Sequence, residues 1–145
     1  MKALIQRVSE ASVDVGGTRV GHISAGLLVF LGVDKSDDAE VVQRLADKVM
    51  NYRIFSDENG KMNRSLIAAN GEMLVVSQFT LSADTQKGLR PSFTSAADPE
   101  LANALYQAFV TACRKKISRV ETGQFAADMQ VSLVNDGPVT FLLEA

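Results

Sequence analysis

Apolar and polar side chains alternate along the first part of the chain and then give way to a continuous apolar run. Residues 2–8 and 12–15 alternate in this way, which is typical of half-buried strands, and a Gly-Gly turn follows at 16–17. The run GLLVFLGV at 26–33 is apolar between its glycines, which predicts a strand buried on both faces. We therefore expect the chain to begin as a meander of short strands followed by one central strand.

Two later stretches show the spacing of amphipathic helices, in which apolar residues recur every three or four positions. The first helix is predicted over 37–51, with Ser36 as its N-cap. The second is predicted over about 99–117, because Asp98 and Pro99 form an N-cap followed by proline at the first helical position. The apolar faces comprise Val41, Val42, Leu45, Val49 and Tyr52 in the first helix, and Leu101, Leu105, Phe109 and Ala112 in the second.

The remaining apolar segments predict further strands. One is expected over 72–81, EMLVVSQFTL, and a short one within 119–125. The last two are expected over 129–135 and 139–144, joined by a tight turn at Asn-Asp-Gly, whose residues tolerate positive φ. Proline follows this turn at once, where the returning strand needs the backbone donors that proline lacks.

Strands outnumber helices in this pattern, and the connections between them are mixed. The sequence therefore predicts an α+β (mixed α/β) fold, in which two main amphipathic helices pack on a mixed, curled, barrel-like sheet. With 145 residues, 46% of them apolar and 22% charged, the chain is expected to form a single domain over 1–145. It has no apolar window of membrane-spanning length and no signal-peptide pattern, and its lone cysteine suits a reducing compartment, so a cytoplasmic protein is expected.

The chain has only one histidine and one cysteine, residue types that often act as base or nucleophile in hydrolases without a metal. His22 is the single histidine and has no carboxylate or cysteine near it in the sequence, which favours a structural role. Cys113 lies on the apolar side of the second predicted helix and is interpreted as a core residue. The sequence has no Gly-x-Ser-x-Gly elbow, Walker loop or metal-type spacing of Cys and His, so no metal or cofactor is expected.

The charge of the chain limits how it can contact nucleic acid. A net charge of −2 and a pI of about 5.4 argue against a broad electrostatic grip on a nucleic acid, but they leave room for contact with one end of an RNA. The long loop at 82–98 carries Lys87 and Arg90, which either contact phosphate or are solvated loop charges.

The segment SQFTL at 77–81 ends its predicted strand with polar side chains. One interpretation is a strand end at which serine and threonine begin a turn. The other is a site in which backbone N–H groups, freed where the strand pairing stops, hold an oxyanion. The Thr80 hydroxyl could also attack a substrate, but it needs a base and the sequence offers none nearby.

The segment NDGPVT at 135–140 also admits two interpretations. It is either a hairpin loop with a trans Gly-Pro bond, or a cis Gly-Pro unit that turns its carbonyl groups outward to bind a ligand. The frequency of cis bonds favours the hairpin loop, because only about 5–6% of X–Pro bonds in folded proteins are cis.

Taken together and in this order, SQFTL and NDGPVT resemble the D-aminoacyl-tRNA deacylases. The likeness covers the whole chain, through ALIQRVSEASVDV, YRIFSDENGKMN, KGLRPSF and TGQFAADMQVSLVNDGPVTF. It implies an enzyme without a cofactor that hydrolyses the ester between a D-amino acid and the 3′-terminal adenosine of tRNA, and that also removes glycine from mischarged tRNA. It further implies a homodimer in which the Gly-Pro pair of one subunit enters the active site of the other.

Site residues follow from the same resemblance. Gly137 and Pro138 are the expected pair, joined by a cis bond, with carbonyl groups that face the substrate's α-amino group and exclude an L side chain. Phe125 and Met129 match positions near the adenine pocket. Four residues are expected to line the pocket for the terminal adenosine and the ester: Ser77, Gln78, Phe79 and Thr80.

The residues themselves favour chemistry without a side-chain nucleophile. Thr80 is regarded in the family as a candidate nucleophile, but backbone N–H groups around Phe79 and Thr80 can polarise the ester carbonyl while water, oriented by the ribose 2′-hydroxyl, attacks. Two other functions stay open at this point. One is a non-catalytic dimeric binding module for a nucleotide or an RNA 3′ end, and the other is an unselective small-ester hydrolase.

Overall fold

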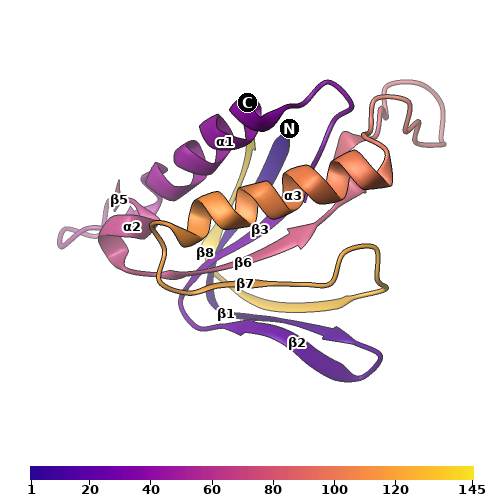
Figure 1. Cartoon of the computed structure of the whole chain (residues 1–145). Helices are drawn as coiled ribbons and strands as arrows, with labels where there is room; N and C mark the ends of the chain where they lie inside the picture. Colours follow the sequence, from indigo (N-terminus) through magenta and orange to yellow (C-terminus); the bar gives the residue numbers. More distant parts are fainter.

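A six-stranded mixed sheet that curls on itself forms the centre of the structure, and two long helices cover one of its faces (Figure 1). The computed structural model of the chain describes residues 1–145. The strand order is β2-β1-β3-β6-β7, and β8 also pairs with β1. The strands of this sheet are β1 (Lys2–Val15), β2 (Thr18–Ile23), β3 (Gly26–Gly32), β6 (Glu72–Ser77), β7 (Val120–Thr122) and β8 (Gln130–Glu144). A separate small hairpin consists of β4 (Phe55–Ser56) and β5 (Met62–Arg64).

Strand β1 holds the sheet together because it pairs along both of its edges. One edge pairs with β3 through residues 2–8 and then with β2 through 11–15, while β8 runs antiparallel along residues 2–14. The two short strands expected at the N-terminus are therefore one continuous strand. Its two halves have different partners on one edge, and β8 spans the point where the partner changes.

The middle of the sheet is parallel, since β3 pairs with β6 and β6 with β7. Strand β3 is buried on both faces, as predicted, and Leu27, Leu28 and Val29 are fully buried. The outer strands of the sheet approach each other, because the Arg119 guanidinium beside β7 donates to the carbonyl of His22 in β2 at 3.0 Å. The predicted α+β fold with a curled, barrel-like sheet is confirmed.

The two main helices are α1 (Ala39–Asn51) and α3 (Pro99–Arg114). The cap of α3 was predicted correctly, and the Asp98 carboxylate accepts a hydrogen bond from the Leu101 amide at 2.9 Å. The cap of α1 is Asp38 and not Ser36, because the Asp38 carboxylate reaches the Val41 amide at 3.0 Å. Two short helical segments were not expected from the sequence: α2 (Leu66–Ala69) and the 3-10 turn η1 (Phe79–Ser82).

Two predicted strand boundaries are wrong. The strand expected over 72–81 ends at Ser77, where the chain enters η1. The final segment is one strand, β8, and not a hairpin, because residues on both sides of Asn-Asp-Gly-Pro pair antiparallel with β1. The chain leaves the sheet at this point and then pairs again with β1 in the same direction. Proline lies in the part that has left the sheet, so its lack of an N–H costs no hydrogen bond between strands.

The larger hydrophobic core lies between the two main helices and the sheet. Cys113 is fully buried within this core, and burial raises the pKa of its thiol to about 12. The interpretation of Cys113 as a core residue therefore agrees with its environment. A second, smaller cluster includes Val13, Ile23 and Leu74 from the strands that curl toward one another. No helix of the structure combines the length and the apolar character needed to cross a membrane.

Candidate active site

The chain turns sharply at the carboxyl end of β6, where the SQFTL segment lies. The Gln78 amide donates to the Leu31 carbonyl at 2.8 Å, which prolongs the pairing with β3 by one bond, and η1 then begins at Phe79. The buried Ser82 hydroxyl donates to the Val33 carbonyl at 3.2 Å and fixes the far end of this turn. The turn packs so closely on β3 that a Cβ atom at Gly32 would lie 2.8 Å from the Cβ of Leu81.

This turn forms one wall of a cavity of about 620 Å³. The cavity is lined mainly by apolar side chains, and its size lies within the range of small-molecule sites. It brings together five of the residues predicted from the sequence: Ser77, Gln78, Phe79, Phe125 and Met129. Residues around the ends of β3 and β6, before and at the start of α3, and around the start of β8 complete the lining: Leu31, Val33, Val76, Phe93, Ala96, Ala97, Pro99, Ala102, Ala126, Ala127 and Val131.

Tyr106 connects the wall of the cavity with helix α3. Its hydroxyl donates to the Val75 carbonyl at 2.9 Å in β6, two residues before Ser77, and its ring lies 6.0 Å from the ring of Phe125. Burial raises the pKa of the Tyr106 hydroxyl from 10.0 to about 12, so the group remains a hydrogen-bond donor well into the alkaline range. Tyr106 thus supports both the strand end and the aromatic ring that lines the cavity.

Two aromatic rings mark the edge of the cavity. Phe79 is 58% exposed and Phe93 is 40% exposed, and their ring centres are 5.1 Å apart. Phe93 directly follows a protruding loop that is closed by two hydrogen bonds between the backbones of Asp84 and Ser92, at 2.7 and 3.0 Å. The exposed residues of this loop include Lys87 and Arg90, neither of which forms an ion pair within the chain.

Thr80 is exposed beside the cavity and is not part of its lining. Its hydroxyl accepts a hydrogen bond from the side-chain amide of Gln78, which is a donor and not a base. No carboxylate or imidazole is hydrogen-bonded to Thr80. The structure therefore gives this hydroxyl a polar partner but no group that would take its proton.

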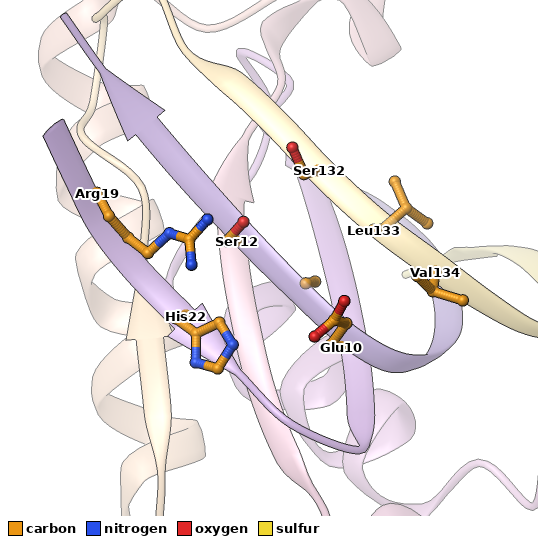
Figure 2. A pocket seen from close by; sticks show the side chains of 8 residues that line it. Glu10, Ser12, Arg19, His22, Ser132, Leu133 and Val134 are labelled. Carbon is orange, nitrogen blue, oxygen red and sulfur yellow. The ribbon is translucent and has the colours of Figure 1, made fainter. Parts of the chain in front are cut away.

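The single histidine lies in a different and smaller hollow of about 170 Å³ on β1, β2 and β8 (Figure 2). His22 is the direct cross-strand neighbour of Ser12, which in turn lies opposite Ser132, and Glu10 is close by on β1. This grouping resembles the members of a catalytic triad, but no hydrogen bond joins the imidazole to Glu10 or to either serine. The predicted structural role of His22 agrees with this arrangement.

The Gly137-Pro138 corner does not line the cavity of its own chain. The peptide bond between these two residues is cis, as the resemblance implied. The register along β1 shows the separation, because Ser77 is level with Leu31 and Ala3, whereas the corner lies opposite Arg7. Four residues along β1 correspond to about 13 Å in the strand direction, and three strand spacings add about 14 Å across the sheet.

Two features of the cavity were not predicted from the sequence. One is Phe93, which the sequence reasoning included only as part of the segment KGLRPSF. The other is the start of α3, where Pro99 and Ala102 line the cavity with small side chains. The position of Pro99 beside an N-cap predicted a helix start, but nothing local indicated which surface that helix start faces. No group of three or more His, Cys, Asp or Glu side chains is arranged to hold a metal ion.

The chain is similar to known proteins over almost its whole length. Residues 4–144 match the family described as D-Tyr-tRNA(Tyr) deacylase. Curated proteins named D-aminoacyl-tRNA deacylase are 66% identical in Histophilus somni and 65% identical in Haemophilus influenzae, each over 143 residues and 99% of both chains. A solved structure named c-Myc DNA Unwinding Element Binding Protein matches with a TM-score of 0.96 and 40% identity, over 100% of this chain and 99% of that one. A structure titled as a probable eukaryotic D-amino acid tRNA deacylase shares the fold, with a TM-score of 0.85 at 17% identity over 99% of this chain and 98% of that one.

Proposed function

The chain belongs to the D-Tyr-tRNA(Tyr) deacylase family and is a D-aminoacyl-tRNA deacylase, and from this premise we propose how the cavity and the Gly-Pro corner divide the work. The cavity binds the 3′-terminal adenosine of tRNA together with its aminoacyl ester. The corner of a second protomer sorts the amino acid by its handedness. The observation that carries the first part is that Ser77, Gln78 and Phe79 share one cavity with Phe125 and Met129.

The lining of the cavity suits a nucleoside. Apolar and aromatic side chains at Phe125 and Met129 can contact a base, because every base has an apolar face. The polar side chains of Ser77 and Gln78 line the same cavity at the end of β6, where they can contact the ribose or the ester. A cavity of about 620 Å³ encloses the terminal nucleoside and the ester but not a helical stem, so only the single-stranded end of tRNA enters it.

Hydrolysis in this site proceeds by attack of water on the ester carbonyl carbon. The carbonyl oxygen becomes an oxyanion, which the amide N–H groups of Phe79 and Thr80 stabilise at the start of η1, where helical N–H groups have no partner within the turn. The intermediate then releases the ribose oxygen, which takes up the proton given by the water. The products are the free D-amino acid and tRNA with a free ribose hydroxyl.

The corner serves selectivity in a neighbouring protomer. It lies outside the cavity of its own chain, and Asp136, Gly137 and Pro138 are all exposed. In the proposed homodimer, main-chain carbonyl groups of the corner accept hydrogen bonds from the substrate's α-amino group. A side chain of the L configuration would then point into the corner, whereas D side chains point away and glycine has none, so both D-aminoacyl and glycyl esters are substrates.

The direct test compares three substrates in parallel: D-tyrosyl-tRNA, L-tyrosyl-tRNA and glycyl-tRNA. We expect hydrolysis of the D and glycyl esters and no hydrolysis of the L ester above the uncatalysed rate. Equal hydrolysis of the D and L esters would show an unselective esterase. Hydrolysis of none of them, with retained binding of the tRNA end, would show the non-catalytic binding module.

The homodimer is tested by mixing two inactive variants. Gly137→Ala disables the corner, because a Cβ atom there would lie 2.7 Å from the Val139 amide nitrogen. Ala127→Trp fills the cavity that Ala127 lines. If corner and cavity come from different protomers of a symmetric dimer, refolding an equal mixture restores about a quarter of the wild-type activity, since half of the dimers are mixed and each has one intact site. No recovery would place corner and cavity in the same chain.

A further inference from the structure

The side chain of Asn135 bridges the two ends of the corner. Its carboxamide oxygen accepts a hydrogen bond from the Val139 amide at 2.7 Å. Its carboxamide nitrogen donates to the Val139 carbonyl at 3.2 Å and to the Thr140 hydroxyl at 3.1 Å. One side chain thus replaces the backbone pairing that is missing where residues 136–139 leave β1.

The ends of the corner are also held by packing and by further polar contacts, which include a hydrogen bond from the Gln6 side-chain amide to the Thr140 hydroxyl at 3.2 Å. The Val139 side chain is only 5% exposed and belongs to the main core, which fixes the point where the chain returns to the sheet. On the other side, the Arg7 guanidinium donates to the Asp136 carbonyl at 2.9 Å and to the Ile54 carbonyl at 2.7 Å. These contacts fix the flanks of the corner, but none of them is made to the Pro138 carbonyl.

The hydrogen bond to the Val139 amide determines where the Pro138 carbonyl points. The Pro138 carbonyl and the Val139 N–H belong to one planar peptide group, and this peptide is trans. In a trans peptide the C=O and N–H bonds point in opposite directions, so an N–H directed at Asn135 turns the carbonyl away from Asn135. The carbonyl therefore points away from Asn135, at a corner whose residues Gly137 and Pro138 are exposed.

We propose that Asn135 is a specificity-determining positioning residue that fixes the Pro138 carbonyl in the direction needed to sort substrates by handedness. This inference rests on the proposed function of the corner. Asn135 does not touch the substrate and acts only through the peptide plane that it holds. Without this side chain, the Val139 N–H loses its partner and the peptide plane is free to rotate, which weakens the grip on the D substrate and relaxes the exclusion of the L substrate.

The test measures the ratio of kcat/KM for D-tyrosyl-tRNA over L-tyrosyl-tRNA in three variants. Asn135→Ala removes all three hydrogen bonds, and the ratio should fall by on the order of tenfold or more, because a misplaced catalytic or positioning group costs up to about 100-fold. Asn135→Asp keeps an oxygen that accepts from the Val139 amide, and it should recover most of the ratio. Thr140→Val removes the exposed Thr140 hydroxyl, which accepts from the side-chain amides of Asn135 and Gln6, but it leaves both bonds between Asn135 and Val139 in place. It is the matched control, with a ratio close to that of the wild type.

Hydrogen exchange of the Val139 amide provides a readout that does not depend on activity. We expect faster exchange in Asn135→Ala by about tenfold, as for removal of one hydrogen bond, and unchanged exchange in Thr140→Val. If Asn135→Ala does not fold, the kcat/KM ratio and the Val139 exchange rate are measured instead on Asn135→Ser, whose side chain is shorter than that of asparagine.

The outcomes separate this inference from the function on which it rests. A wild-type protein that hydrolyses neither ester would overturn both. A wild-type protein that sorts the esters, together with an Asn135→Ala variant that sorts them equally well or loses both rates in parallel, would overturn only the role of Asn135. Faster exchange at Val139 with an unchanged ratio would likewise show that the orientation of this peptide does not matter for selection.

Discussion

Replacing Thr80 by valine decides whether its hydroxyl takes part in the chemistry. Valine keeps the branched shape of the side chain and removes only the oxygen that accepts from the Gln78 amide. Thr80 and Gln78 form an exposed pair, so the loss is that of one hydrogen bond, about 1 kcal/mol or about fivefold in rate. Removing the nucleophile of a hydrolase, in contrast, lowers the rate on the order of 10⁴-fold to 10⁶-fold.

The assay is single-turnover hydrolysis of D-tyrosyl-tRNA with enzyme in excess over substrate, because this separates binding from chemistry. We expect Thr80→Val to retain at least about a tenth of the wild-type rate at saturating enzyme. A rate reduced more than about 1,000-fold, with the substrate still bound, would refute the reasoning and assign the hydroxyl a chemical role.

Gln78→Met provides the matched control for this experiment. It removes the donor of the same hydrogen bond while keeping a side chain of similar length. If Thr80 acts only through this bond, the double variant is little slower than Gln78→Met alone, because that variant has already removed the shared interaction. Additive losses would show that the two side chains act separately.

Three further outcomes follow from the structure. Changing Lys87 and Arg90 together to alanine should weaken tRNA binding. The slope of the log binding constant against log salt concentration should become less steep by about 0.7 for each phosphate that the loop no longer neutralises. An unchanged slope in a salt titration would show that the loop does not contact the RNA backbone. The free energy of unfolding, measured in urea, should fall between pH 9 and pH 12, because burial raises the pKa of Cys113 from 9.0 and of Tyr106 from 10.0, each to about 12, so the unfolded chain loses these protons first. The fall reaches at most about 1.4 kcal/mol per pH unit for each group, and Cys113→Ala should reduce it, whereas a flat profile would contradict this account. His22→Asn should leave the rate of D-ester hydrolysis unchanged, and a loss above about tenfold would place the second hollow in the reaction.

Local signals in the sequence predicted those elements whose ends are fixed by neighbouring residues. Helix α3 begins at Asp98 and Pro99, and both the cap and the start could be predicted because an N-cap and a proline act within one turn. At α1 the sequence offers more than one capping residue, and Asp38 rather than Ser36 is used. Choosing between adjacent caps depends on how the preceding loop crosses the sheet, which no local pattern reports.

The final strand shows where local reasoning fails. Asn-Asp-Gly indicates a chain reversal, but β1 is long enough to pair with residues on both sides of the segment, and this long-range pairing outweighs the local preference. Because the side chains keep their alternation on both sides, the pattern of apolar residues does not distinguish a hairpin from an excursion within one strand.

The candidate site depended on resemblance more than on pattern. SQFTL was one of two possible sites from its residues alone, and Phe125 and Met129 were named from the family likeness. The cavity joins Ser77, Gln78 and Phe79 with Phe125 and Met129 although nearly fifty residues separate them in the sequence. Phe93 and the start of α3 could not be found in this way, because they reach the cavity only through tertiary packing. The exclusion of the corner from its own cavity likewise follows from strand register, which the sequence does not specify.

The first half of β1 sets a fixed span between the two parts of the proposed site. The start of this strand is level with Ser77, and Arg7 near its middle lies opposite the excursion of β8, so a rigid sheet keeps them at a constant separation. Inserting two residues in β1 between these levels would preserve the inward and outward alternation of its side chains but lengthen the span by about 6.6 Å. Such a variant could fold with an intact core, yet two copies related by a twofold axis could no longer place each corner in the other's cavity.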